Sequence, residues 1–209
     1  KEDLDAILDK TSDTKVTLLF SATMPSNVQQ ISKTYMDNPH EITVGTRNAG
    51  IETVDHVCYA VRSHDRYLAL KRIVDYHPEI YGIIFCRTRV ETKDVAAKLI
   101  QDGYNADALH GELSQSQRET VMHKFRIKNL QILVATDVAA RGLDVKDITH
   151  IINYNLPDEV DLYIHRSGRT GRAGQLGVSI AIVNLRETNK IRMIEVRLRR
   201  KFEQKQVPT

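Results

Sequence analysis

The stretch QILVATDVAARGLDV, residues Gln131–Val145, begins as a continuous apolar run and turns polar at Thr136. A strand covered by helices on both faces has this pattern, because the side chains on both of its faces are buried and therefore apolar. Apolar runs of strand length recur along the chain and alternate with amphipathic stretches. The runs are Thr17–Phe20, Glu41–Val44, Val54–Val61, Ile80–Cys86, Ala106–Leu109, Gln131–Ala135, Thr149–Tyr154 and Val178–Val183.

Helix candidates with capping signals lie between these runs. Thr88 with Glu91 predicts a capping box for a helix that ends at Gly103, and Ser114 with Gln117 predicts a second capping box. Strands that alternate with helices predict an α/β fold with a doubly wound, mainly parallel sheet and helices on both faces. In such a fold the functional loops lie at the carboxyl ends of the strands.

Composition favours a globular protein. Hydrophobic residues make up 41% of the 209 positions and charged residues 27%, with no apolar run of membrane-spanning length and no charged-then-apolar leader. We therefore expect a cytoplasmic protein without a membrane partner. Cys58 and Cys86 lack CxxC or histidine spacing, which favours buried free thiols over a disulfide or a metal site. The net charge is +3, and the basic end, residues 186–209, suits either a polyanion partner or a solvated terminal helix.

The first 44 residues fit this fold poorly. They supply two short strands and a helix at Ser26–Met36, and the strand Thr17–Phe20 needs sheet neighbours that the segment does not provide. We interpret residues 1–44 as the C-terminal remnant of a preceding domain, residues 45–53 as a linker and residues 54–209 as a complete second lobe.

Polar loops follow most strands of the second lobe, and together they predict a long anionic ligand. Taken singly, each residue has a structural alternative. His110 with Gly111 fits a plain turn, Arg118 a solvated helix residue and Asp144 an N-cap or a surface ion pair. Thr136 with Asp137 fits the cap of a short helix. The sequence DEVD, residues 158–161, has the pattern of a DExD box, whose carboxylates hold a metal ion. We discount this match, because Asp158 after Pro157 also predicts a helix start.

The stretch YIHRSGRTGRAGQLG, Tyr163–Gly177, sets Arg166, Arg169 and Arg172 three residues apart among four glycines. The chain has no GxxxxGK[ST] loop to cradle a triphosphate, yet a guanidinium offered from outside such a loop accelerates phosphoryl transfer by roughly 10³–10⁵. The glycines would end a helix and let the backbone approach a ligand. The alternative is a cluster of surface arginines in a flexible loop.

Five stretches of the chain resemble motifs of the DEAD-box family of ATP-dependent RNA helicases, in the expected order and at the expected separations. They look like the third motif, the fourth, the His-Gly element with QxxR, the fifth and the sixth. In order, they are SATMP (Ser21–Pro25), IIFCRTR (Ile83–Arg89), HGELSQSQR (His110–Arg118), ATDVAARGLDV (Ala135–Val145) and YIHRSGRTGRAG (Tyr163–Gly174).

The resemblance implies a RecA-like lobe that works with another lobe. In that family two lobes close over ATP and RNA, and this chain is similar to the second lobe preceded by the end of the first. The missing first lobe would hold Mg²⁺ and the phosphates of ATP, so we expect the chain to be a piece of a longer helicase and inactive alone. Two rival functions stay open: a nucleic-acid-binding module without catalysis, and the lobe of a DNA translocase.

The same resemblance implies a role for each matching residue. Arg169 and Arg172 would reach the γ-phosphate, with Arg172 favoured as the arginine finger, and Asp144 with Gly142 would contact the nucleotide. His165 and Arg166 would link these arginines to the third motif and to Asp137. Contacts to the RNA backbone are implied for Arg87, Thr88, Gly111, Gln115, Arg118, Thr136 and Gly142. Coupling between the lobes is implied for Ser21, Thr23, Asp137 and Arg166.

Overall fold

The computed structural model describes residues 2–12, 14–21, 24, 26–43 and 53–209, called the described ranges below. The chain divides into two compact units, Lys1–Asn48 and Ala49–Thr209. Their boundary falls among residues 44–52, which lie outside the described ranges. The predicted division into a lobe remnant, a linker and a second lobe therefore stays a prediction.

The described residues of the first unit form two helices, α1 (Glu2–Leu8) and α2 (Ser26–Tyr35), which are joined by a hydrogen bond from the Tyr35 hydroxyl to Asp5. The predicted helix at residues 26–36 is confirmed. The predicted strand at Thr17–Phe20 is wrong, because residues 15–20 have no regular structure and no neighbouring strand to pair with. The strand predicted at Glu41–Val44 is also wrong at residues 41–43, and Val44 lies outside the described ranges.

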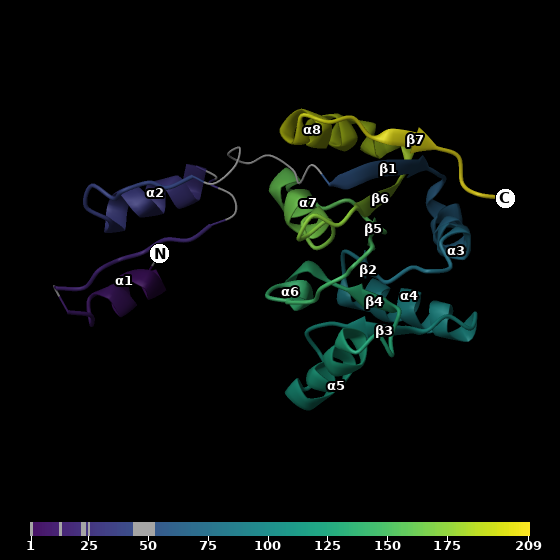
Figure 1. Cartoon of the computed structure of the whole chain (residues 1–209), viewed down its shortest axis with the longest axis horizontal. Helices are drawn as coiled ribbons and strands as arrows, with labels where there is room; N and C mark the ends of the chain where they lie inside the picture. Colours follow the sequence, from purple (N-terminus) through teal and green to yellow (C-terminus); the bar gives the residue numbers. More distant parts are fainter. Residues whose placement is uncertain (1, 13, 22–23, 25, 44–52) are drawn as a thin grey trace. The chain divides into compact units, whose positions relative to one another are not determined.

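The second unit is built on a parallel sheet of seven strands in the order β3-β4-β2-β5-β6-β1-β7 (Figure 1). Every strand pair in this sheet is parallel. All six strands predicted for this unit are confirmed, with ends shifted by at most two residues. The strands are β1 (Val54–Ala60), β2 (Gly82–Phe85), β3 (Ala106–Leu109), β4 (Ile132–Ala135), β5 (His150–Asn153), β6 (Gly177–Val183) and β7 (Glu203–Lys205).

Helices cover both faces of this sheet, which confirms the predicted doubly wound α/β class (Figure 1). One face packs against α3 (Arg66–Tyr76) and α4 (Arg89–Gln101). The other face packs against four helices. They are α5 (Gln115–Arg126), α6 (Asp137–Ala140), α7 (Val160–Ser167) and α8 (Thr188–Leu198). Short 3-10 turns, η1 (Ser63–Asp65) and η2 (Leu185–Glu187), precede α3 and α8.

Neighbouring residues of β2 point to opposite faces, as the pleat requires. Ile84 packs with α3 and α4, whereas Ile83 and Phe85 pack with α5 and α6. Cys58 and Cys86 are buried free thiols, as predicted, and burial raises the pKa of both. Each face of the strand is therefore apolar, which explains the continuous apolar runs in the sequence.

The capping predictions succeed at α5 and in part at α4. Ser114 and Gln117 form the full capping box of α5. At α4 the Thr88 side chain accepts from the Glu91 N–H, but the Glu91 carboxylate accepts from the Arg87 N–H instead of closing the box. The helix start predicted at Asp158 is two residues early, because α7 begins at Val160.

Within the described ranges, every helix is too short or too polar to cross a bilayer. The same ranges contain no group of three histidine, cysteine or acidic side chains arranged to hold a metal ion.

Candidate functional site

The predicted site residues of the second unit gather in the loops and helix ends at one edge of the sheet. Because the strands are parallel, their carboxyl ends open on this edge. The loops after β2, β3 and β4 lead into α4, α5 and α6, and the loop after β5 leads into α7. The contacts described below tie these loops to one another.

Arg166, on the last turn of α7, is the buried centre of this edge. Its side chain is 3% exposed and forms a two-pronged pair with Asp137 at the start of α6, with Nε–Oδ1 at 2.6 Å and Nη2–Oδ2 at 2.7 Å. Its Nη1 donates to Asn153 Oδ1 at 2.9 Å and to the Asn155 carbonyl at 2.7 Å. The guanidinium also lies 4.9 Å from the ring centroid of Phe85. This one side chain therefore joins α7, the start of α6 and the end of β5.

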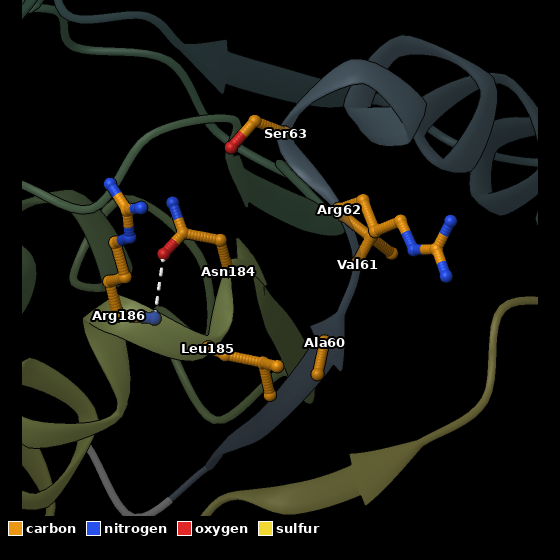
Figure 2. Close-up of a pocket in the computed structure, with 7 residues that line it drawn as sticks. All are labelled: Ala60, Val61, Arg62, Ser63, Asn184, Leu185 and Arg186. Atoms are coloured by element: carbon orange, nitrogen blue, oxygen red, sulfur yellow. Dashed lines mark hydrogen bonds between the residues drawn. The ribbon is translucent and has the colours of Figure 1, made fainter.

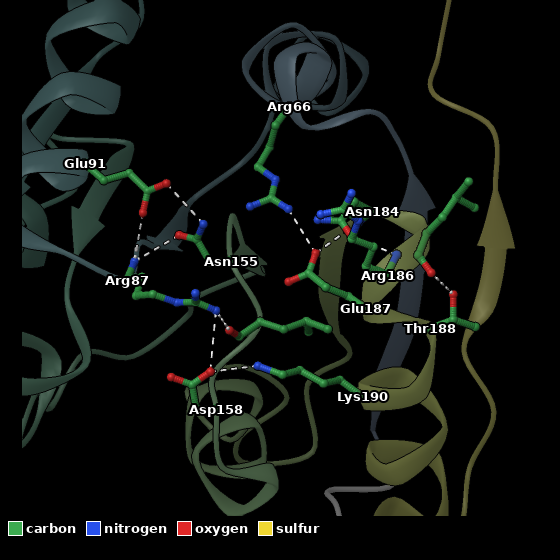
Figure 3. Close-up of polar contacts among 12 residues, drawn as sticks. Arg66, Arg87, Glu91, Asn155, Asp158, Asn184, Arg186, Glu187, Thr188 and Lys190 are labelled. Carbon is green, nitrogen blue, oxygen red and sulfur yellow. Dashed lines mark hydrogen bonds and ion pairs between the residues drawn. The ribbon is translucent and has the colours of Figure 1, made fainter.

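Asn155 extends this network to the loop after β2 (Figure 3). Its Oδ1 accepts from the Arg87 N–H at 2.9 Å, and its Nδ2 donates to Glu91 Oε1 at 3.1 Å. The Arg87 guanidinium is half exposed, lying 3.4 Å from the Leu156 carbonyl and 3.5 Å from Asp158. The backbone at Arg87 is thus fixed from two sides, while its charged end faces solvent.

The sequence analysis missed the two asparagines that hold these arginines. Asn153 and Asn155 are both buried at the end of β5. The signal lay in the stretch IINYN, because an amide at two alternate positions of a buried strand requires hydrogen-bond partners.

Most side chains of the predicted RNA-binding residues form hydrogen bonds to other groups of the protein. Thr136 caps α6, and Arg118 Nη2 donates to the Ala139 carbonyl at 2.6 Å. Gln115 Nε2 donates to Glu119 Oε1 at 2.7 Å, and Thr88 caps α4 as described above. Gly111 and Gly142 have no side chain, and both are exposed. These loops therefore present mainly backbone groups and helix ends to a ligand.

The loop after α7 carries the other two arginines. Gly168 caps α7, as predicted, and Gly171 has a φ of +68°. A Cβ at Gly171 would meet Val54 Cγ2 at 2.5 Å, so the loop passes close to β1. The half-buried Arg169 donates from Nη1 to the Leu143 carbonyl at 2.9 Å, and the exposed Arg172 donates from Nε to the Gly168 carbonyl at 2.8 Å.

Neither of these two guanidiniums has a carboxylate partner within the described ranges. Burial lowers the pKa of Arg169, and the nearby charge of Arg172 lowers it further. Two adjacent cations without a counter-charge favour an anionic ligand.

The remaining predicted residues lie apart from the Arg166 network or outside the described ranges. Asp144 is exposed in the loop before β5, next to the Leu143 carbonyl that accepts from Arg169, and His165 is exposed on α7. Ser21 is exposed in the first unit, and Thr23 lies outside the described ranges.

The second unit matches the family model described as the helicase conserved C-terminal domain over residues 65–174. Among curated proteins, the ATP-dependent RNA helicase CshA of Limosilactobacillus reuteri is 40% identical over 194 residues, which are 93% of this chain and 39% of that protein. The DEAD-box ATP-dependent RNA helicase CshA of Geobacillus kaustophilus is 38% identical, covering 100% of this chain and 44% of its own length. This chain therefore spans less than half of the relatives it matches.

Solved structures give the same picture. A DEAD box protein from Methanococcus jannaschii is 41% identical with a TM-score of 0.70, over 98% of this chain and 55% of that one. Dbp5 of S. cerevisiae, solved bound to RNA and ADP BeF3, is 26% identical with a TM-score of 0.89, over 99% of this chain and 55% of that one. The RecA-like form of the predicted fold is thereby confirmed.

Proposed function

This chain belongs to the DEAD-box family of ATP-dependent RNA helicases, and we propose that it supplies the C-terminal lobe of such an enzyme in the cytoplasm. In this proposal the lobe binds the RNA backbone and offers arginines to ATP, which a preceding lobe of the same full-length protein holds together with Mg²⁺. Neither lobe completes the ATP site alone, so hydrolysis depends on closure of the two.

The observation that carries the proposal is the pair Arg169 and Arg172. Both guanidiniums lie on one glycine-rich loop, and neither has a carboxylate partner in the described ranges. A guanidinium is planar and permanently charged, so it can donate two parallel hydrogen bonds to phosphoryl oxygens, and it stabilises the charge that develops during phosphoryl transfer. We assign the arginine-finger role to Arg172, because it is the more exposed of the two.

Three further residues complete the nucleotide side of the proposal. Asp144 would hydrogen-bond the ribose, with Gly142 close to it in the same loop. His165 lies on α7, one residue before Arg166. It would link the loop after α7 that carries Arg169 and Arg172, here named the arginine loop, to the first-lobe residues Ser21 and Thr23.

The RNA side of the proposal rests on the loops after β2, β3 and β4. Their side chains mostly cap helices or bind neighbouring loops, so contacts to phosphates and 2′-hydroxyls would come from backbone groups and from the Arg87 guanidinium. Such contacts carry little sequence information and weaken with salt, and 2′-hydroxyl contacts favour RNA over DNA. The RNA-binding residues in this proposal are Arg87, Thr88, Gly111, Gln115, Arg118, Thr136 and Gly142.

Arg166 and Asp137 provide the physical link between the two sides. Asp137 follows Thr136 in the proposed RNA loop, and Arg166 precedes the arginine loop by two residues. Their two-pronged pair ties the loops together, so a shift of one loop displaces the other.

The decisive experiment is Arg172→Ala in the full-length protein. ATP turnover is expected to fall by about 10³-fold or more, with ATP binding little changed, because the guanidinium acts on charge that develops during the reaction. Arg126→Ala is the matched control, since Arg126 is an exposed arginine at the end of α5, on the opposite edge of the sheet. Steady-state ATPase rates and nucleotide titrations supply both readouts.

Turnover that survives Arg172→Ala would refute the arginine-finger assignment. Robust ATP hydrolysis by the 209-residue chain alone would refute the two-lobe arrangement. Stimulation by a DNA strand equal to that by the matched RNA strand would favour the translocase alternative, because a DNA strand lacks the 2′-hydroxyls.

A further inference from the structure

A pocket of about 470 Å³ lies where β1 and β6 end (Figure 2). Its lining comes from two short segments that follow these neighbouring strands. They are Ala60–Ser63 after β1 and Asn184–Arg186 after β6. The pocket opens at the carboxyl edge of the sheet, the same edge as the proposed RNA loops, yet none of the family motifs quoted above includes its residues.

Each polar side chain of this pocket can donate a hydrogen bond. Arg62 and Arg186 are exposed, and neither forms an ion pair within the described ranges. In Figure 2 their guanidiniums point away from each other, and the side chains of Ser63 and Asn184 lie between the two arginines. Asn184 Oδ1 accepts from the Arg186 N–H at 2.9 Å, which leaves the amide NH₂ available to a ligand.

The acidic group nearest in sequence is already neutralised. Glu187 pairs with Arg66 at 3.0 Å, with both side chains largely buried, and it also accepts from the Asn184 N–H at 3.0 Å. The ion pair of Glu187 with Arg66 thus neutralises this carboxylate and holds η2 against α3 (Figure 3). The exposed groups of the pocket keep a net positive charge.

We propose that this pocket binds a backbone phosphate of RNA and lengthens the RNA track beyond Arg87. The inference rests on the proposed function, because it extends the same RNA strand. Arg62 and Arg186 would contact phosphate oxygens, with Ser63 and Asn184 as neutral donors. Leu185, whose side chain is 85% exposed, would pack against a ribose or a base.

The surface between Arg87 and the pocket also carries a net positive charge. Asp158 pairs with Lys190 at 2.7 Å and with Arg87 at 3.5 Å, so two cations surround one carboxylate and leave a net charge of +1. Lys190 lies in the first turn of α8, four residues after Arg186. Strands in a sheet lie about 4.8 Å apart, so the order β2-β5-β6-β1 places the pocket about 10–15 Å from the end of β2. A few nucleotides span that separation.

The test compares RNA lengths with the double variant Arg62→Ala/Arg186→Ala. Fluorescence anisotropy at low salt, with uridine oligonucleotides of about 6 and about 12 nucleotides, measures the affinity. We expect the variant to bind the longer RNA about 5–10-fold more weakly and the shorter RNA almost normally. The slope of log K against log salt for the longer RNA should fall by about 1–1.5, because each lost phosphate contact removes about 0.7.

Two controls separate this inference from the proposed function. Arg126→Ala removes one positive charge from the opposite edge and should leave both affinities unchanged, whereas Arg87→Ala should weaken the binding of both RNAs. If the double variant binds the longer RNA as the wild type does while Arg87→Ala weakens it, the pocket proposal is overturned and the proposed function stands. If the wild-type full-length protein binds neither RNA in the presence of ATP, both are overturned.

Discussion

The buried end of α7 and the exposed loop after it use the same residue type in opposite ways. Arg166 is 3% exposed and shares its guanidinium among Asp137, Asn153 and Asn155. Arg172, six residues later, is exposed and donates to a single backbone carbonyl. A buried cation persists when partners surround it, whereas an exposed cation without a counter-charge is available to a ligand. Burial and pairing, which the spacing of the arginines does not reveal, separate the two roles.

The largest predicted effect comes from breaking the buried side of this comparison. Arg166→Ala should lower the free energy of unfolding by about 3–5 kcal/mol, because it leaves Asp137 and two asparagine groups without their partner in a closed site. Urea unfolding followed by circular dichroism measures the change.

Arg166→Lys is the matched variant for this prediction. It keeps the charge but not the planar fork, so the loss should be smaller than for alanine and still measurable. A loss below about 1 kcal/mol for Arg166→Ala would contradict the view that this pair holds α6, α7 and β5 together.

His56 is a second buried basic side chain and, unlike Arg166, it has hydrogen-bond partners for only part of its polar atoms. His56 Nδ1 lies 2.8 Å from the Tyr163 hydroxyl, but the buried Nε2 has no hydrogen-bond partner in the described ranges. Burial, followed by the charge of Arg200, lowers the pKa of His56 to about 4. The folded state therefore binds its proton less readily than the unfolded state does.

The sign of the pH effect follows from this lowered pKa. As pH falls below about 6.5, the unfolded chain takes up a proton that the folded chain refuses until about pH 4, so the free energy of unfolding falls over this window. His56 should account for a loss of about 3 kcal/mol by pH 4. Urea titrations between pH 7 and pH 4 measure the slope.

The variants make this pH prediction specific. His56→Gln should flatten the dependence on pH, whereas His64→Gln should not, because the His64 side chain is 72% exposed. An unchanged slope in His56→Gln would show that this imidazole is solvated or paired in solution.

The sequence predicts the second unit well because its signals are local. A strand buried on both faces needs an apolar run, and a helix start needs a cap, so the six strands and the α5 capping box are readable from adjacent residues. These local signals fail where a strand depends on pairing with a neighbouring strand. Thr17–Phe20 has the composition of a strand but no neighbour, while β7 is a strand only because β1 lies beside it, as its three residues are all exposed.

The candidate site is predictable as a set of loops and less so as a set of contacts. The spacing of Arg166, Arg169 and Arg172 does not distinguish them, and only the family resemblance assigned Arg166 a different role from the other two. Their separation depends on Asn153 and Asn155, which reach Arg166 only after β5 has been placed beside β6 and α7 has been folded onto the sheet. Long-range packing of this kind leaves no fixed spacing in the sequence.

The smallest predicted effect lies on the exposed side of the comparison. Arg172→Ala should change the free energy of unfolding by less than about 0.5 kcal/mol, because the side chain is solvated and its hydrogen bond to Gly168 is exposed. Arg169→Ala should cost about 1 kcal/mol, since its half-buried guanidinium holds the Leu143 carbonyl. Urea unfolding of both variants at pH 7 measures these values. If Arg172→Ala destabilised the chain as much as Arg166→Ala, Arg172 would be a structural residue, and any loss of ATP turnover in that variant would follow from unfolding rather than from a missing phosphate contact.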